Sequence, residues 1–301
     1  MHASNLQKPL VLLALTAACL APMQASALVG GAGIDPNSGA SPWNGVGSLD
    51  VGGSFFTATL IAPGYVLTAA HVVQGAAASN ISFQINGGTS YSVGASNVFV
   101  NPDYTGTTTG NLQGDPTNHN DLAIIQLAGS VGSDIPTYSL YNGPMGGQDL
   151  NFVSYANSSS VKKTGENIVN VVLPSAGNAN QNYVFTYDAP GTGDSLGLGR
   201  EAGLEHGDSG SAAFVNVNGQ WQLAGINTFE VFYQNGPTSG YGTGGGGVAV
   251  GSYASWINSV IATQAAPLTP IPEPENWPLL VAGLAVLGFT VRRKKVLSPA
   301  G

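Results

Sequence analysis

The sequence predicts an all-β fold, and three features support that prediction. Short apolar runs of strand length recur through the middle of the chain and are separated by turn residues. With 43 glycines and only 8% charged residues, the composition is typical of a protein rich in strands and turns, and unlike a coiled coil or a disordered chain. Apolar residues return to helical spacing only near residues 253–261, where we expect an amphipathic helix.

Each expected strand follows from its own pattern. Residues 42–49 begin the first half, residues 55–61 and 65–68 form a hairpin, and residues 81–85 alternate between apolar and polar side chains. Residues 98–100 and 122–127 complete this half on either side of a long polar loop at 101–120. Residues 128–149 cross to the second half, where we expect strands at 150–155, 168–173, 183–187, 212–217, 221–226 and 248–250.

Residues 1–27 have the three regions of a secretory signal peptide. Lys8 supplies the positive region, residues 9–20 supply the apolar region, and Ala25-Ser26-Ala27 is a small-residue cleavage site. A weaker alternative is a lipoprotein signal at Thr16-Ala17-Ala18-Cys19. Cys19 is the only cysteine, so we expect the exported chain to contain no disulfide.

The stretch Gly207-Asp208-Ser209-Gly210 carries the chemistry that we expect. Small residues around Ser209 indicate a tight turn that exposes the hydroxyl and aims the N–H groups of Gly207 and Ser209 at one point, as an oxyanion hole requires. A serine hydroxyl needs a base to remove its proton, and that base needs a carboxylate to orient it. His71, after an apolar run, and Asp121, at the entrance of a strand, supply this pair.

Other candidate residues fit this chemistry less well. Asp103 and Asp115 lie in loop sequence without a following apolar strand. Gly193-Asp194-Ser195-Leu196 matches the motif of the GDSL esterases, but no Asp-x-x-His pair follows it. We expect His119 in a loop and His206 near the substrate rim, where it either contacts substrate or is simply exposed. No spacing of histidines and cysteines indicates a metal site.

Three blocks in order resemble those of the trypsin/chymotrypsin-like serine peptidases: LTAAH at 67–71, NDLAI at 120–124 and GDSG at 207–210. The resemblance runs from about residue 28 to 262. It implies two packed six-stranded antiparallel β-barrels, at 28–135 and at 136–264 with the terminal helix, and a cleft between them that holds His71, Asp121 and Ser209. It also implies a serine endopeptidase that acts on peptide or protein substrates and needs no cofactor.

The expected mature N-terminus resembles that of the same family. Cleavage after Ala27 exposes Leu28-Val29-Gly30-Gly31. The resemblance implies that the amino group of Leu28 pairs with Asp208 and thereby sets the oxyanion loop. Signal peptidase itself would then produce the active N-terminus. The alternative is that Val29-Gly30-Gly31 is only a flexible start.

The resemblance places Gly203, Thr228, Phe229 and Glu230 in the substrate pocket. Gly203 stands where trypsin-like members carry Asp, so that route to Arg or Lys specificity is absent. Glu230 stands where the family usually has Gly. If its side chain narrows the pocket mouth, we expect the pocket to accept a small or medium substrate residue. If its carboxylate points inward, a basic substrate residue remains possible.

The C-terminal tail is a segment separate from the two expected barrels. After a linker at 265–271, residues 272–295 combine Pro272-Glu273-Pro274, an apolar run at 277–291 and the basic cluster 292–295. As a helix, fifteen apolar residues reach only ~22 Å across a ~30 Å hydrocarbon core. The pattern resembles the PEP-CTERM sorting signal of Gram-negative bacteria. It implies an exosortase as partner and a membrane-anchored periplasmic precursor that ends at the cell surface or outside the cell. A plain membrane anchor is the alternative.

The charge distribution limits the possible partners. Lys162, Lys163 and Arg200 are the only basic residues between the two ends of the chain, and such an acidic body argues against nucleic-acid binding. Two alternatives to a peptidase stay open. One is a weak or inactive homologue that acts as a surface or matrix binding protein, and the other is an esterase on the same fold.

Overall fold

The structure, a computed structural model, describes residues 28–85, 91–106, 120–174, 181–233 and 235–264. The expected signal peptide at 1–27, the linker at 265–271 and the sorting signal at 272–295 lie outside the described residues, as do Asp115 and His119. Within the described ranges, no helix is long and apolar enough to cross a membrane. The chain divides into two compact units, Met1–Val260 and Ile261–Gly301, and the sheets and the candidate site belong to the first.

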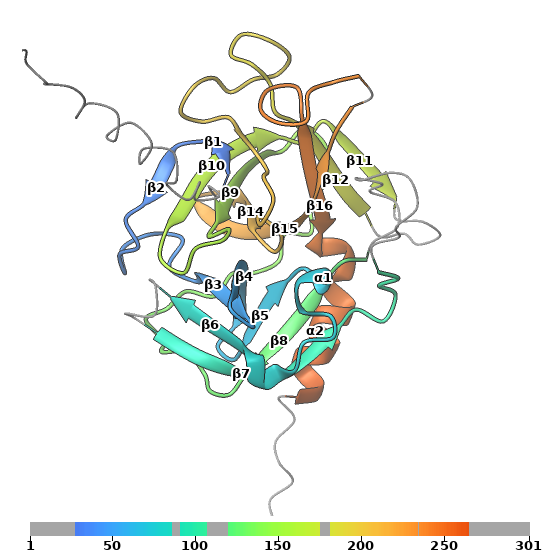
Figure 1. The fold of residues 1–301 in the computed structure, drawn as a ribbon. Coiled ribbons are helices and arrows are strands. Elements are labelled where there is room, and N and C mark those ends of the chain that lie inside the picture. Colours follow the sequence, from blue (N-terminus) through green and yellow to red (C-terminus); the bar gives the residue numbers. More distant parts are fainter. Residues whose placement is uncertain (1–27, 86–90, 107–119, 175–180, 234, 265–301) are drawn as a thin grey trace, which may run out of the picture. The chain divides into compact units, whose positions relative to one another are not determined.

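The first half of the chain forms a closed six-stranded barrel (Figure 1). Its strands are β3 (Val46–Val51), β4 (Ser54–Ala62), β5 (Tyr65–Thr68), β6 (Ile81–Ile85), β7 (Tyr91–Val100) and β8 (Ala123–Leu127), in the spatial order β3-β4-β5-β8-β7-β6. Buried and half-buried side chains alternate along β6, as its sequence predicts. Thr68 of β5 pairs with Ala123 of β8, so the segment that follows β5 meets the segment that precedes β8.

The second half forms an eight-stranded sheet of order β11-β12-β16-β15-β14-β9-β10-β2. Its strands are β2 (Gly33–Asp35), β9 (Asp149–Ser154), β10 (Lys162–Ile168), β11 (Val171–Pro174), β12 (Gln181–Thr186), β14 (Ala212–Val217), β15 (Gln220–Val231) and β16 (Gly244–Ala249). Two of these eight strands, β2 and β10, were not among the six that we expected in this half. The side-chain amide of Asn167 in β10 donates to the carbonyl of Thr186 in β12 at 2.9 Å, so strands far apart in this order approach each other. The predicted all-β, chymotrypsin-like architecture is confirmed.

The prediction of one strand at 168–173 is wrong, because β10 ends at Ile168 and β11 begins only at Val171. The sequence of β10, KKTGENI, lacks the apolar run by which we recognised the other strands. Lys162 is nevertheless fully buried, since its Nζ lies 3.1 Å from a carboxylate oxygen of Asp35 and donates to the carbonyl of Trp43 at 3.1 Å. Burial lowers the pKa of Lys162. A buried ion pair therefore takes the place of an apolar contact in this strand.

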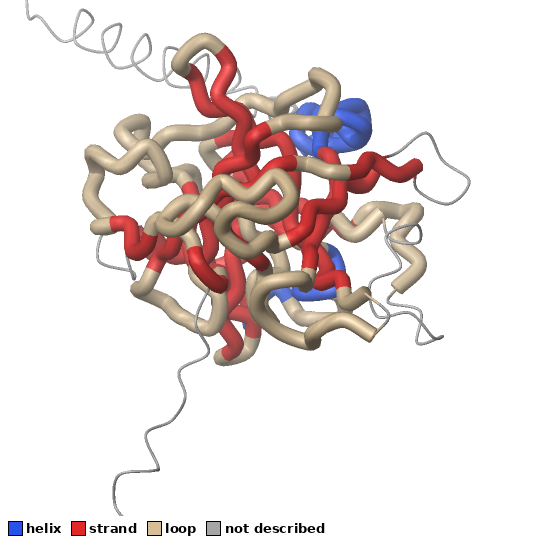
Figure 2. Tube along the Cα trace, turned by 90° about the horizontal axis from the view of Figure 1, so that it is seen from above, coloured by secondary structure: helices blue, strands red, loops and turns tan. Residues whose placement is uncertain are grey.

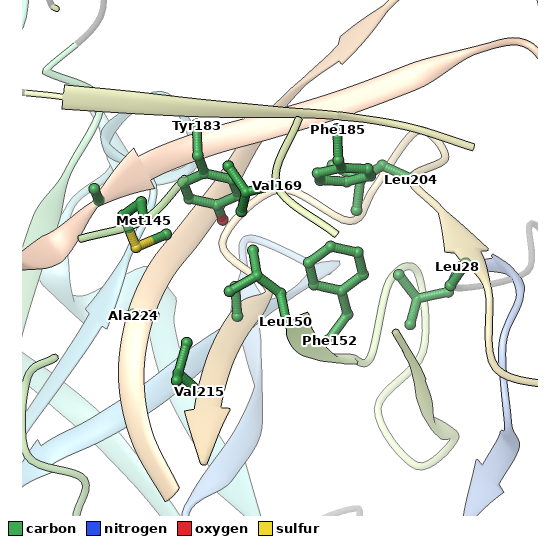
Figure 3. Close-up of a cluster of buried hydrophobic side chains, with 13 residues drawn as sticks. Leu28, Met145, Leu150, Phe152, Val169, Tyr183, Phe185, Leu204, Val215 and Ala224 are labelled. Carbon is green, nitrogen blue, oxygen red and sulfur yellow. The ribbon is translucent and has the colours of Figure 1, made fainter. Parts of the chain in front are cut away.

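The start of the described chain is built into the second half. β1 (Val29–Gly30) pairs with β13 (Ala202–Gly203), the segment that precedes the GDSG turn. Leu28 is only 1% exposed and belongs to the buried hydrophobic cluster that also contains Phe152 and Leu204, as Figure 3 shows. Leu28 is therefore part of a core, and Val29 and Gly30 are held by strand pairing, which does not fit a flexible start.

Helices are few among the described residues, and Figure 2 shows how much of this part of the chain is strand and loop. The helical segments are α1 (Ala70–Val73), η1 (Ala78–Asn80), η3 (Val250–Tyr253) and α2 (Ala254–Gln264). Tyr253 and Ile257 are buried, which confirms the predicted apolar face of the C-terminal helix. The short α1 follows β5 directly and carries His71.

Candidate active site

The turn that carries Ser209 depends on glycine. Gly207 and Gly210 have φ angles of 102° and 83°, in the left-handed region that favours glycine. A Cβ on Gly210 would also collide with the carbonyl of Thr57 and the side chain of Thr68, because the first barrel lies against this turn. The turn therefore places Ser209 where the second half of the chain meets the first barrel.

The pairing of β5 with β8 brings His71 and Asp121 together. His71 lies just after β5 and Asp121 just before β8, at the end where these two antiparallel strands meet. The Nδ1 atom of His71 lies 2.5 Å from Oδ2 of Asp121, and the backbone N–H of His71 donates to Oδ1 at 2.8 Å. Asp121 is 2% exposed, so two hydrogen bonds fix the orientation of a buried carboxylate.

The other nitrogen of His71 faces the serine. Its Nε2 atom lies 2.7 Å from Oγ of Ser209. When Nδ1 gives its proton to the hydrogen bond with Asp121, Nε2 is left as the acceptor for the hydroxyl proton. The structure thus joins the three residues that the sequence singled out. The rival Asp103 lies near this pair, because its backbone carbonyl accepts a hydrogen bond from the side chain of Asn120 at 2.9 Å, but the carboxylate that faces His71 is that of Asp121.

The serine of the esterase-like motif has a different environment. The hydroxyl of Ser195 donates to the carbonyl of Asp188 at 3.4 Å and accepts from the N–H of Gly197 at 3.2 Å. Both partners are backbone groups of the same loop. Such contacts stabilise a turn and supply no base for a nucleophile.

The candidate oxyanion hole consists of two backbone N–H groups. No acceptor within the described part of the chain takes up the N–H of Gly207 or of Ser209. The next two residues do have partners, because Gly210 donates to the carbonyl of Asn227 and Ser211 to that of Asp208, each at 2.9 Å. The unused pair is available to a negatively charged oxygen beside Ser209.

Asp208 is buried behind the nucleophile and gathers several donors. It is 1% exposed and accepts from the hydroxyl of Ser154 at 2.6 Å and from the N–H of Glu205 at 2.7 Å. The backbone nitrogen of Leu28 lies 3.2 Å and 3.3 Å from its two oxygens. Burial raises the pKa of Asp208 to about 7 although these hydrogen bonds oppose the rise. The carboxylate therefore lacks a full compensating charge in the full-length chain, where the Leu28 nitrogen is a peptide N–H.

A cavity of about 170 Å³ lies beside the candidate nucleophile. Its lining includes His71, Ser209 and three of the four residues predicted for the pocket, Thr228, Phe229 and Glu230. Gly203 does not line this cavity. A Cβ there would lie 2.9 Å from a methyl carbon of Val29 and 3.0 Å from the ring of Tyr187, so packed side chains already fill the space around it. Leu204, Glu205 and His206 line the cavity as well.

A polar network behind the nucleophile turn was not predicted. The side chain of Asn227 accepts from the hydroxyl of Tyr183 at 2.7 Å and donates to the hydroxyl of Ser211 at 2.9 Å, and all three residues are fully buried. Backbone bonds at 2.9 Å also link Asn227 to Gly210 and Ser211. The sequence signal was Ser211, which follows the GDSG block where the resembled family has another glycine; its partner Asn227 lies in an apolar strand.

Comparisons with known proteins agree with this architecture. The family model described as Trypsin matches residues 28–257. A scabies mite inactivated protease paralogue, S-I1, shares 18% identity over 74% of this chain and 95% of its own, with a TM-score of 0.51. A Glu endopeptidase shares 20% identity over 79% of this chain and 97% of its own, with a TM-score of 0.55. No curated protein matches the sequence.

Proposed function

Because the chain belongs to the trypsin family, we propose that it is a serine endopeptidase that hydrolyses peptide bonds of peptides or proteins through an acyl-enzyme on Ser209. The observation that supports this most strongly is the continuous hydrogen-bonded chain from Asp121 through His71 to Ser209, with distances of 2.5 Å and 2.7 Å. A structural role alone does not require all three groups in this order.

The first half of the reaction forms the acyl-enzyme. His71 Nε2 takes the hydroxyl proton while Ser209 Oγ attacks the scissile carbonyl, and the new negative charge on the carbonyl oxygen is stabilised by the N–H groups of Gly207 and Ser209. Asp121 stabilises the imidazolium that forms. Collapse of the tetrahedral intermediate breaks the C–N bond, and His71 gives its proton to the departing amine.

The second half of the reaction releases the product. A water molecule gives a proton to His71 and attacks the acyl carbon, and the tetrahedral intermediate again places its charge in the oxyanion hole. Collapse returns the proton to Ser209 Oγ and frees the carboxylic acid. Since every proton passes through His71, the cycle needs only water besides the substrate.

The position of Leu28 supports a proposal about activation. Cleavage after Ala27 by signal peptidase would turn the Leu28 nitrogen, now 3.2 Å from Asp208, into an ammonium group. This charge would compensate the buried carboxylate and fix the turn that holds Gly207 and Ser209. A separate activation step would then be unnecessary.

We propose from the sequence that the precursor is exported from a Gram-negative bacterium and held at the membrane by residues 272–295. An exosortase would then release it to the cell surface or the surroundings. Mass spectrometry of the protein recovered from a native host tests this: we expect termini at Leu28 and near Pro272-Glu273-Pro274, and an intact C-terminus would instead indicate a plain anchor.

Peptide hydrolysis tests the proposed activity. The protein starting at Leu28 is incubated with a mixed peptide library, beside its Ser209→Ala and Ser195→Ala variants. We expect cleavage by the wild type and by Ser195→Ala, and loss of cleavage in Ser209→Ala. If the folded wild-type protein cleaves no peptide, the binding-protein alternative is favoured; if it turns over esters only, the esterase alternative is.

A further inference from the structure

Two neighbouring cavities extend the candidate site away from Ser209. The first, of about 170 Å³, contains Ser209 and His71 in its lining. The second, of about 290 Å³, is lined in addition by Phe232 and by residues 238–240, 243 and 244. Four residues line both cavities, namely Leu204, Glu205, His206 and Glu230. The two spaces therefore adjoin one another, with these four residues as their common wall.

This common wall carries two carboxylates and no Lys or Arg. The three Lys and Arg residues of the described chain have partners elsewhere: Lys162 pairs with Asp35, Arg200 pairs with Asp149 and Glu166, and Lys163 donates to a backbone carbonyl. No described Lys or Arg forms an ion pair with Glu205 or Glu230. Both carboxylates are partly buried, and such groups are stabilised by a nearby cation.

The electrostatic environment of Glu230 agrees with this picture. Burial raises the pKa of Glu230, the charge of Glu205 raises it further, and His206 lowers it. Two acidic groups thus lie close enough to influence each other, with one exposed histidine as the only counter-group at the wall. A substrate cation that entered between them would remove their mutual repulsion.

The position that carries the specificity carboxylate in trypsin-like relatives is filled by packing in this chain. Leu204 is 6% exposed, and the Val29 and Tyr187 side chains pack against Gly203, where a specificity carboxylate stands in trypsin-like relatives. Apart from the buried Asp208, the acidic residues that line the two cavities are therefore Glu205 and Glu230, and not a residue at position 203. This arrangement suits a long side chain with an apolar stem and a cationic end.

We propose that Glu205 and Glu230 form an acidic subsite that accepts the Lys or Arg side chain of the residue whose carbonyl Ser209 attacks. The inference rests on the proposed peptidase function and adds its substrate class. Of the two alternatives for Glu230, it favours the carboxylate that faces the substrate, because this residue lines both cavities.

The test uses four peptides that are identical except for Lys, Arg, norleucine or Glu at the position before the scissile bond. Norleucine keeps the apolar stem of Lys without its charge. The wild type, Glu205→Gln and Glu230→Gln are compared with Asp134→Asn, which removes the same formal charge from an exposed loop. We expect the wild type to prefer Lys and Arg. Each glutamine variant should reduce kcat/KM for the Lys peptide by about tenfold, as loss of a charged hydrogen bond does, and leave the norleucine peptide nearly unchanged. Asp134→Asn should behave as wild type.

Two results would overturn the proposal. One is a wild-type preference for Glu or norleucine over Lys, and the other is a Lys-to-norleucine ratio that neither glutamine variant changes. Binding of the same peptides to Ser209→Ala, measured by calorimetry, separates this inference from the proposed function. If no peptide is hydrolysed, the peptidase proposal fails, yet preferential and Glu230-dependent binding of the Lys peptide still supports the acidic subsite, and its absence refutes it.

Discussion

The link between Leu28 and Asp208 gives the sharpest prediction. The perturbation is an extension by one residue of the protein that begins at Leu28, so that it begins at Ala27. This moves the ammonium group away from Asp208, leaving the peptide N–H that the structure shows at 3.2 Å. Both proteins can be released from a fusion partner with a defined first residue, and they differ only in this terminus.

The magnitude follows from the raised pKa of Asp208. In the uncleaved chain burial raises it from 3.8 to about 7. A difference of about 3 pKa units corresponds to roughly 4 kcal/mol at 1.36 kcal/mol per unit. Because the folded-state pKa lies above the unfolded value, the associated stability is present below pH 3.8 and is lost as the pH rises through about 7. In the protein that begins at Leu28, the ammonium group favours the carboxylate and opposes this loss.

Thermal unfolding at pH 5 and pH 8 tests the prediction. Between these pH values the extended protein loses only the part of this stability that is still present at pH 5, about 2 pKa units or roughly 2.7 kcal/mol. We therefore expect its Tm to fall by roughly 5–10 °C relative to the Leu28 protein, at about 2–4 °C per kcal/mol for a domain of this size. Asp208→Asn in the extended protein should remove this pH-dependent difference. Peptide hydrolysis at pH 8 should fall in parallel in the extended protein. Equal Tm and equal activity of the two proteins at pH 8 would refute the reasoning.

Three further predictions concern single contacts. In Asp121→Asn we expect kcat to fall by about 10⁴ with the fold intact, because an amide at this position favours the wrong His71 tautomer; steady-state kinetics measures this, and an activity near wild type would contradict the role of Asp121. Lys162→Met should lower the free energy of unfolding in urea by about 3–5 kcal/mol, because it leaves Asp35 charged and buried, and an unchanged midpoint would show that the ion pair contributes little. In Asn227→Val each buried polar group that loses its partner costs about 1–3 kcal/mol, and the nucleophile turn is released. We therefore expect kcat to fall more than KM rises. A change in KM alone would place Asn227 in substrate binding instead.

The residues of the candidate active site could be predicted because the proposed chemistry constrains their local sequence. Ser209 needs glycines on either side to form its turn, and His71 and Asp121 need the ends of two apolar strands that pair. Both requirements are local, so each is visible in a few consecutive residues. The alternation along β6 and the turn between β4 and β5 were predictable for the same reason.

Features that depend on distant partners could not be predicted. The polar strand β10 contains Lys162, which forms a buried ion pair with Asp35, a residue far away in the sequence. Asn227 lies in an apolar strand, and only the folded chain shows that its side chain meets Ser211 and Tyr183. Gly203 was assigned to the pocket from the family resemblance, but the packing of Tyr187 against it became visible only in three dimensions.

The central claim is that Ser209 is an activated nucleophile, and covalent labelling with a fluorophosphonate probe tests it most directly. The protein starting at Leu28 is treated with the probe, digested and mapped by mass spectrometry, beside Ser209→Ala and Ser195→Ala. We predict a single adduct on Ser209 that persists in Ser195→Ala and is absent from Ser209→Ala. A folded protein that takes up no probe, or that carries the adduct on Ser195, would contradict the claim.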